Sequence, residues 1–205
     1  MKKLLQSIES LKASNISIKV KERITEFNNI TSEDELFKEL CFCIMTANYQ
    51  AEKSIQIQAN IDNGFITFTK DKLKKELRNN GYRFPNVRAE YIHEARKHRK
   101  ILKNTINSLE ERELREWIVK NVKGIGFKEA SHFLRNIGFK NSAIIDFHII
   151  DILADNKIIA KPKTITKNNY LEIETRLKQL AEKTSLNLAE LDLYLWYLET
   201  GKILK

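Results

Sequence analysis

Residues 122–130 read VKGIGFKEA, and this stretch decides the fold prediction. Apolar residues at helical spacing precede and follow it, which places Gly124 and Gly126 between two helices. Two glycines separated by one apolar residue let the backbone turn sharply, while Ile125 fills the space between the helices. The amides at the start of the second helix then face outward and, together with the helix dipole, suit a phosphate. An ordinary hairpin of two helices, which also favours glycine at its turn, is the alternative.

Glycine and proline are scarce in the chain as a whole. The 205 residues include six glycines and two prolines, where average usage predicts roughly 24 of these residues. Sandwiches, barrels and doubly wound sheets need glycine or proline at many tight turns, so the composition favours long helices. Apolar residues make up 42% of the chain, enough for one good core or two small ones.

Apolar periodicity and capping signals predict a chain of helices. Capping-box spacing, in which a short polar side chain and a carboxylate three residues later satisfy the first amides, begins at Ser32, Ser108, Asn169 and Asn187. Residues 64–68 alternate weakly without a partner strand and are predicted to form a connector. The predicted helices span residues 2–13, 17–28, 33–47, 50–62, 70–79, 87–103, 109–121, 127–137, 147–155, 168–184 and 188–200.

The net charge of +9 suits a polyanionic partner or an acidic membrane surface. A lysine-rich composition can also reflect the base composition of a genome. No apolar run is long enough to span a bilayer, and the first residues lack the features of a secretion signal. We therefore expect a cytoplasmic protein without a membrane contact. We also expect a monomer. Since no linker divides the chain, we expect a single two-lobed unit over residues 1–205, with the middle forming one lobe and the two ends closing on each other.

The cysteines and histidines do not predict a cofactor. Cys41 and Cys43 would point about 200° apart on a helix, so buried free thiols are expected. Two cysteines also exclude a four-cysteine iron–sulfur cluster within this chain. The four histidines lack the spacing of a zinc site. We expect no metal and no cofactor.

Two segments together resemble the helix-hairpin-helix DNA glycosylase superfamily. Residues 123–130 resemble its hairpin, with Lys128 in the position of the nucleophile. Residues 144–148, IIDFH, resemble the segment with its catalytic aspartate, here Asp146. The hairpin alone also occurs as a non-catalytic phosphate clip in polymerases, ligases and nuclease subunits. The lysine and an aspartate eighteen residues later make the resemblance more specific, and they define residues 109–155 as the hairpin and catalytic segment.

Further segments are similar to the archaeal-type 8-oxoguanine DNA glycosylase/lyase family. Residues 45–48, MTAN, resemble the stretch that places a polar wedge in the vacated duplex position, and residues 80–85 and 88–92 resemble the family's Gly-Tyr-Arg loop and following helix. The likeness covers most of residues 32–205. Many helix-hairpin-helix proteins have proline where this chain has Lys123, which leaves the hairpin less fixed but adds a cation near the phosphate path.

The resemblance implies an all-α, two-lobed glycosylase fold with an active-site cleft between the lobes, acting on double-stranded DNA that contains a damaged base. It also implies a nucleoid-associated enzyme, and it allows a monovalent cation at the hairpin carbonyls. The implied base pocket contains Phe84, Trp196 and Lys205, the last being the final residue of the chain. The expected DNA-binding residues are Gly124, Gly126, Lys123, Asn48, Arg83 and Arg88.

Lys128 and Asp146 are the expected catalytic pair. An unprotonated Lys128 could attack the sugar C1′, displace the base and form a Schiff base that permits β-elimination. The helix dipole and partial burial would both lower the pKa of a lysine in the first turn. Asp146 could face the developing positive charge of the sugar. The plain alternatives are a phosphate contact for Lys128 and a helix N-cap for Asp146, and Asp146 could fill both roles.

The remaining candidates also have ordinary structural interpretations. Asn48 could be a surface residue of a helix, and Trp196 could be a core residue, because the last helix is apolar on nearly every side. Ile203 and Leu204 indicate that the C-terminal end is packed. The predicted function is removal of 8-oxoguanine by base flipping, with associated abasic-site lyase activity. A non-catalytic DNA-binding module and a glycosylase for another oxidised base are the alternatives.

Overall fold

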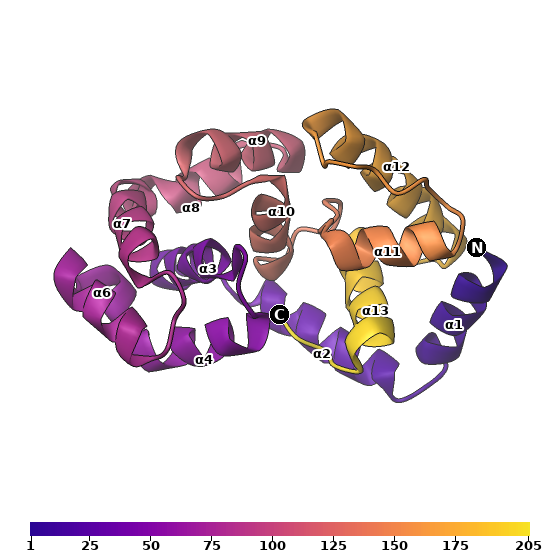
Figure 1. The fold of residues 1–205 in the computed structure, drawn as a ribbon, viewed down its shortest axis with the longest axis horizontal. Helices are drawn as coiled ribbons and strands as arrows, with labels where there is room; N and C mark the ends of the chain where they lie inside the picture. The colour runs from indigo at the N-terminus through magenta and orange to yellow at the C-terminus, as the bar shows by residue number, and fades with distance from the viewer. The chain divides into compact units, whose positions relative to one another are not determined.

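The structure, a computed structural model, describes residues 1–205, and every regular element in it is a helix. The expected all-α class is therefore confirmed. The chain forms two compact units, which we call the central unit, Ile30–Ile137, and the terminal unit, Met1–Asn29 with Gly138–Lys205 (Figure 1).

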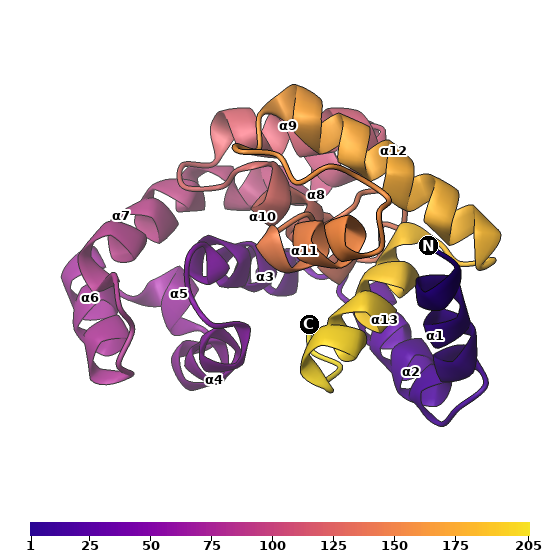
Figure 2. The same ribbon diagram turned by 45° about the vertical axis from the view of Figure 1, so that its right-hand side comes forward.

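The central unit is built around one buried helix, α3. Nearly every residue of α3 from Leu36 to Thr46 is buried, and α4, α5, α7, α8 and α10 pack against it (Figures 1 and 2). A helix that is apolar on most sides is typical of a core position. The helices of this unit are α3 (Glu33–Thr46), α4 (Ala51–Ile61), α5 (Gly64–Thr67), α6 (Lys70–Asn79), α7 (Pro85–Ala95), the 3₁₀ helix η1 (Arg96–His98), α8 (Arg99–Ser108), α9 (Glu111–Asn121) and α10 (Phe127–Asn136).

The terminal unit is built around the last helix of the chain. α13 (Leu188–Thr200) packs against the other four helices of this unit. Val20 and Phe27 of α2 (Ile16–Asn28) form a buried cluster with Leu193 and Tyr194 of α13. The other helices are α1 (Lys2–Lys12), α11 (Phe147–Asp155) and α12 (Lys167–Lys183). No helix in the structure has both the length and the apolar character needed to cross a bilayer.

Cys41 and Cys43 lie on α3 as free, buried thiols, as the sequence predicts. Burial raises the pKa of the Cys41 thiol well above its ordinary value. Both residues therefore contribute to the apolar core of the central unit rather than to a reactive site.

The largest error in the predicted helices concerns residues 87–103. The structure divides this region into α7, η1 and α8, and it starts α7 at Pro85. At the division, the Arg96 guanidinium donates to the carbonyl oxygens of Phe65 and Gly64, at 2.8 and 3.3 Å. These partners are distant in sequence, so periodicity could not reveal the break. The predicted connector at 64–68 also contains one helical turn, α5.

Two of the four predicted capping boxes are confirmed. Ser32 caps α3 and Asn187 caps α13, each with a glutamate three residues later reaching back to the cap amide. The prediction at Ser108 is wrong, because the N-cap of α9 is Glu110 and the helix begins at Glu111. The prediction at Asn169 is also wrong, because Thr166 caps α12 and accepts the Asn169 amide.

Protonation of His98 should destabilise the central unit. His98 Nε2 lies 3.0 Å from the backbone oxygen of Asn121, the last residue of α9, and burial lowers the pKa of His98 below its ordinary value of 6.5. The native state then binds this proton less readily than the unfolded chain does. The stabilisation that neutral His98 gives to the native state is complete above about pH 6.5 and is lost as the pH falls through the lower native pKa.

We expect a lower melting temperature at about pH 5.5 than at about pH 7.5, because this interval spans the unfolded-state pKa of histidine. The decrease should be smaller in His98→Gln, which carries no titrating ring. The same decrease in both proteins would contradict this assignment.

Candidate active site

The turn between α9 and α10 can close only if residue 124 has no side chain. Gly124 has a φ of +85°, and a Cβ there would lie 2.3 Å from Cδ2 of Tyr91 on α7. No other residue type avoids both the left-handed strain and this overlap. Ile125 is 6% exposed and fills the interior of the turn, as the sequence predicts. The hairpin is therefore seated directly on the ring of Tyr91.

One carboxylate connects the turn to the predicted nucleophile. Gly126 is the N-cap of α10, and its amide donates to Glu129 Oε2 at 3.2 Å. The other oxygen of Glu129 lies 3.3 Å from Lys128 Nζ. Lys128 is the second residue of α10, in the first turn as predicted, and its side chain is 29% exposed. Glu129 thus bridges a backbone amide and the amine that would react.

Lys123 is exposed, but α7 already supplies it with partners. Its Nζ lies 3.3 Å from Glu90 Oε1 and 3.6 Å from Glu94 Oε2. The hydrogen bond that Lys123 donates to Glu90 is the main reason that the pKa of Lys123 is raised, so the side chain remains a cation. A phosphate at the hairpin would have to compete with these two carboxylates.

Asn48 lies in the turn between α3 and α4 rather than within a helix. It is exposed and has a φ of +59°, a left-handed conformation that asparagine tolerates better than most residues. Two carbonyls at the end of α3 are held from outside the helix. Tyr82 Oη donates to Met45 O at 2.6 Å, and Arg88 Nη2 donates to Ala47 O at 2.8 Å. The side chain of Asn48 is thus presented to solvent on a fixed backbone.

Arg88, a predicted DNA-binding residue, has a partner within the central unit. Its side chain is buried, with 9% exposure, and its guanidinium caps α3 through Ala47. Arg83 is exposed, and its guanidinium carbon lies 5.0 Å from the centre of the Phe84 ring. Phe84 is half-buried at the N-terminus of α7. Arg83 and Phe84 therefore remain available for the contacts predicted for them.

Asp146 lies on the terminal unit as the N-cap of α11. Its Oδ1 accepts the amide of Ile149 at 3.0 Å, so the capping role is real. The Phe147 side chain that follows is 66% exposed. His148 comes next, with Nδ1 3.4 Å from Glu199 Oε1 on α13.

Trp196 lies beside His148. The two rings meet edge to face with 5.7 Å between their centres. Trp196 is half-buried, and its Nε1 is buried without a hydrogen-bond partner. The partly buried position explains why apolar periodicity alone did not distinguish a core residue from a pocket residue.

The C-terminal end of the chain is packed, as Ile203 and Leu204 predict. Ile203 contacts the cluster formed by Val20, Phe27 and α13. Lys205 follows in an irregular, half-buried segment of the terminal unit. The structure thus places Asp146, Trp196 and Lys205 on the terminal unit. All other predicted site residues lie on the central unit.

Sequence reasoning missed several residues that shape these sites, notably Glu129, Tyr82, Tyr91 and His148. Glu129 had a usable signal, since a glutamate three residues after a helix N-cap is the carboxylate of a capping box. The partners of the other three residues are distant in sequence. Pattern alone could not have found those contacts.

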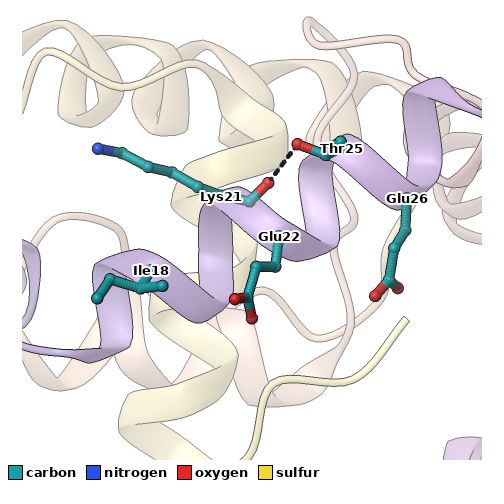
Figure 3. A pocket seen from close by; sticks show the side chains of 5 residues that line it. All are labelled: Ile18, Lys21, Glu22, Thr25 and Glu26. Carbon is teal, nitrogen blue, oxygen red and sulfur yellow. Dashed lines mark hydrogen bonds between the residues drawn. The ribbon is translucent and has the colours of Figure 1, made fainter.

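A hollow elsewhere on the surface does not coincide with the predicted site. It lies over α2 and is lined by Ile18, Lys21, Glu22, Thr25 and Glu26 (Figure 3). All five residues come from one helix, and Thr25 Oγ1 donates to the backbone oxygen of Lys21 at 2.9 Å.

The structure also has no group of three histidine, cysteine or carboxylate side chains arranged to hold a metal ion.

Comparison with solved structures defines the class of protein. The chain is similar to an 8-oxoguanine glycosylase/lyase of Methanocaldococcus jannaschii in complex with a 15mer DNA containing 8-oxoguanine, with a TM-score of 0.96 and 48% identity over 98% of this chain and 99% of that one. It is also similar to the 8-oxoguanine DNA glycosylase of Thermotoga maritima, with a TM-score of 0.94 and 39% identity over 100% and 99% of the two chains. The fold is that of the helix-hairpin-helix DNA glycosylases.

The sequence comparisons define the family. Residues 20–186 match the family described as 8-oxoguanine DNA glycosylase. A relative from Korarchaeum cryptofilum, an 8-oxoguanine DNA glycosylase/AP lyase, is 50% identical over 204 residues, which cover 98% of each chain. This chain belongs to the 8-oxoguanine DNA glycosylase family.

Gly124→Ala should strongly destabilise the central unit. It combines a left-handed backbone with an overlap against the Tyr91 ring, and we expect a loss of about 3 kcal/mol in unfolding free energy. Gly81→Ala is the matched control, because Gly81 has a φ of +72° but nothing within 4 Å of the added Cβ. Its expected loss is about 1 kcal/mol. Urea denaturation measures both, and equal losses would show that contact with Tyr91 does not matter.

Proposed function

We propose that Lys128 is the nucleophile with which this chain removes 8-oxoguanine from double-stranded DNA and then cleaves the strand. The observation that carries the proposal is the position of Lys128, in the first turn after a glycine hairpin with its amine held by Glu129. The 8-oxoguanine glycosylase/lyase of M. jannaschii, whose structure contains DNA with 8-oxoguanine, shares this fold. Family membership and geometry support the same chemistry.

The reaction would proceed through an imine. The nitrogen of Lys128 bonds to C1′ of the sugar, the C1′–N9 bond breaks, and its electron pair leaves with the base, which takes up a proton. Opening of the sugar ring then gives a Schiff base between Lys128 and C1′. Loss of a C2′ proton and cleavage of the C3′–O bond expel the 3′ phosphate. The ion pair with Glu129 must open before the amine reacts.

We assign Asp146 the role of stabilising positive charge on the sugar as the base departs. A carboxylate fixed at a helix N-terminus needs little reorganisation during the reaction. Oδ1 of Asp146 is engaged by the Ile149 amide, which holds the side chain in one orientation. Capping and catalysis are therefore compatible at this residue.

The DNA contacts follow from exposure and charge. The hairpin amides near Gly124 and Gly126, together with Lys123 and Arg83, would bind phosphates, and Asn48 would occupy the space left by the flipped base. The base pocket would be formed by Phe84, Trp196 and Lys205.

The accompanying predictions concern the state of the enzyme and its ions. We propose a monomer that associates with the nucleoid in the cytoplasm and needs no cofactor. A monovalent cation at the hairpin also stays a prediction. The turn can offer neutral backbone oxygens to such an ion, although Val122 O already accepts the Ile125 amide at 3.4 Å.

Borohydride trapping tests the nucleophile on duplexes that contain 8-oxoguanine, an abasic site or normal guanine. We expect a covalent adduct on the first two duplexes and complete loss of the adduct in Lys128→Gln, with DNA affinity within about fivefold of the parent. Lys100→Gln, at an exposed lysine of α8, is the control and should trap normally.

Three outcomes would contradict the proposal. A persistent adduct in Lys128→Gln would exclude Lys128 as the nucleophile. DNA binding without an adduct on any duplex would favour a non-catalytic binding module. Trapping only on the abasic site would exclude 8-oxoguanine as the substrate and leave another damaged base as the alternative.

Asp146→Asn separates the two roles of Asp146. Asparagine is a good N-cap but carries no charge, so the melting temperature should change little while base release slows about a hundredfold or more. Single-turnover assays and thermal melting measure the two effects. A large fall in melting temperature with normal base release would make Asp146 a cap only.

A further inference from the structure

The residues before α11 run through the interior of the terminal unit without regular secondary structure. Ser142, Ala143 and Ile145 are 7%, 3% and 1% exposed, and the segment leads directly into Asp146. Backbone amides and carbonyls that are buried outside a helix or sheet need partners from other parts of the chain. The source of those partners determines where Asp146 lies.

The partners come from two side chains of α12. The hydroxyl of Tyr170 donates to Ala143 O at 2.6 Å and accepts the amide of Ile145 at 3.2 Å. Glu174 Oε1 accepts the amide of Ala143 at 2.9 Å. Tyr170 and Glu174 are 3% and 4% exposed and lie one helical turn apart, on the same face of α12. We call these two residues the α12 clamp.

The clamp fixes Asp146 from the upstream side. The last of its three hydrogen bonds is to Ile145, the residue next to Asp146 in the chain. On the downstream side, Asp146 O accepts the amide of Ile150 at 3.0 Å, and Oδ1 accepts that of Ile149. The backbone of Asp146 is thus held by α12 before it and by α11 after it.

We propose that Tyr170 and Glu174 are positioning residues for Asp146. This inference rests on the catalytic role proposed above for that carboxylate. Removal of the Tyr170 hydroxyl deprives a buried carbonyl and a buried amide of their partner, so the segment must shift to find others. A displacement of about 1 Å at a catalytic group lowers a rate by roughly a hundredfold.

A purely structural role for the clamp predicts a different result. Buried polar residues often serve only to satisfy the backbone, and their loss then lowers stability without affecting one chemical step selectively. A positioning residue acts through its target. Its effect should therefore largely disappear once the charge of Asp146 has been removed.

A double-mutant cycle with Tyr170→Phe and Asp146→Asn distinguishes a positioning role of the clamp from a purely structural one. The readouts are the single-turnover rate of 8-oxoguanine release at saturating enzyme and the Kd for the DNA. We expect Tyr170→Phe to lower the rate about 10- to 100-fold in the parent and less than about threefold in the Asp146→Asn background, with Kd within about twofold in both. Tyr194→Phe, at a buried tyrosine in the cluster with Val20 and Phe27, is the control.

An equal reduction by Tyr170→Phe in both backgrounds, or no reduction in the parent, would overturn the inference. Glu174 provides a second test if Tyr170→Phe does not fold. Glu174→Gln keeps an oxygen that can accept the Ala143 amide, so its rate should exceed that of Glu174→Ala by about tenfold. Equal rates for these two variants would also overturn the inference.

The same experiment separates this inference from the proposed function. A normal rate in Asp146→Asn alone would refute the catalytic role of Asp146, and with it the role of the clamp. A slow Asp146→Asn combined with a normal Tyr170→Phe would refute only the clamp.

Discussion

The contact between the backbone of Gly124 and the ring of Tyr91 is the constraint on which the candidate active site depends. Any side chain at residue 124 would overlap the ring, so the turn between α9 and α10 can pack on α7 only with glycine at this position. That packing places Gly126 as the N-cap of α10, and therefore Lys128 as the second residue of the helix, within its first turn. Glu129 then joins the two, because one carboxylate contacts both the Gly126 amide and the Lys128 amine.

Irregular backbone elsewhere in the chain is held by side chains in the same way. The Asn48 turn is fixed by Tyr82 and Arg88, which donate to carbonyls at the end of α3. The segment before Asp146 is fixed by the α12 clamp, Tyr170 and Glu174. In both cases a residue with a proposed contact to DNA lies outside a helix and next to backbone groups that form hydrogen bonds with buried side chains. Such rigidity is what a site needs when its groups must act with little reorganisation.

Much of the fold could be predicted because most helices of this chain have an apolar face and a local start signal. Ser32 and Asn187 are N-caps that a local pattern of four residues predicts correctly. The break at η1 could not be read, since Arg96 stabilises it through carbonyls about thirty residues away. The candidate site shows the same division. Motifs in the sequence predict Lys128 and Asp146 as candidates, whereas the burial of Arg88 depends on a partner forty-one residues away, Ala47.

Among the 36 lysines and arginines of the chain, we propose that Lys128 forms the covalent bond to DNA. Peptide mapping by mass spectrometry of the borohydride-reduced complex tests this claim most directly, because it identifies the modified side chain in the unaltered protein. We predict that the sugar remnant is attached to Nζ of Lys128. Attachment to any other lysine, or to the amino terminus, would contradict it.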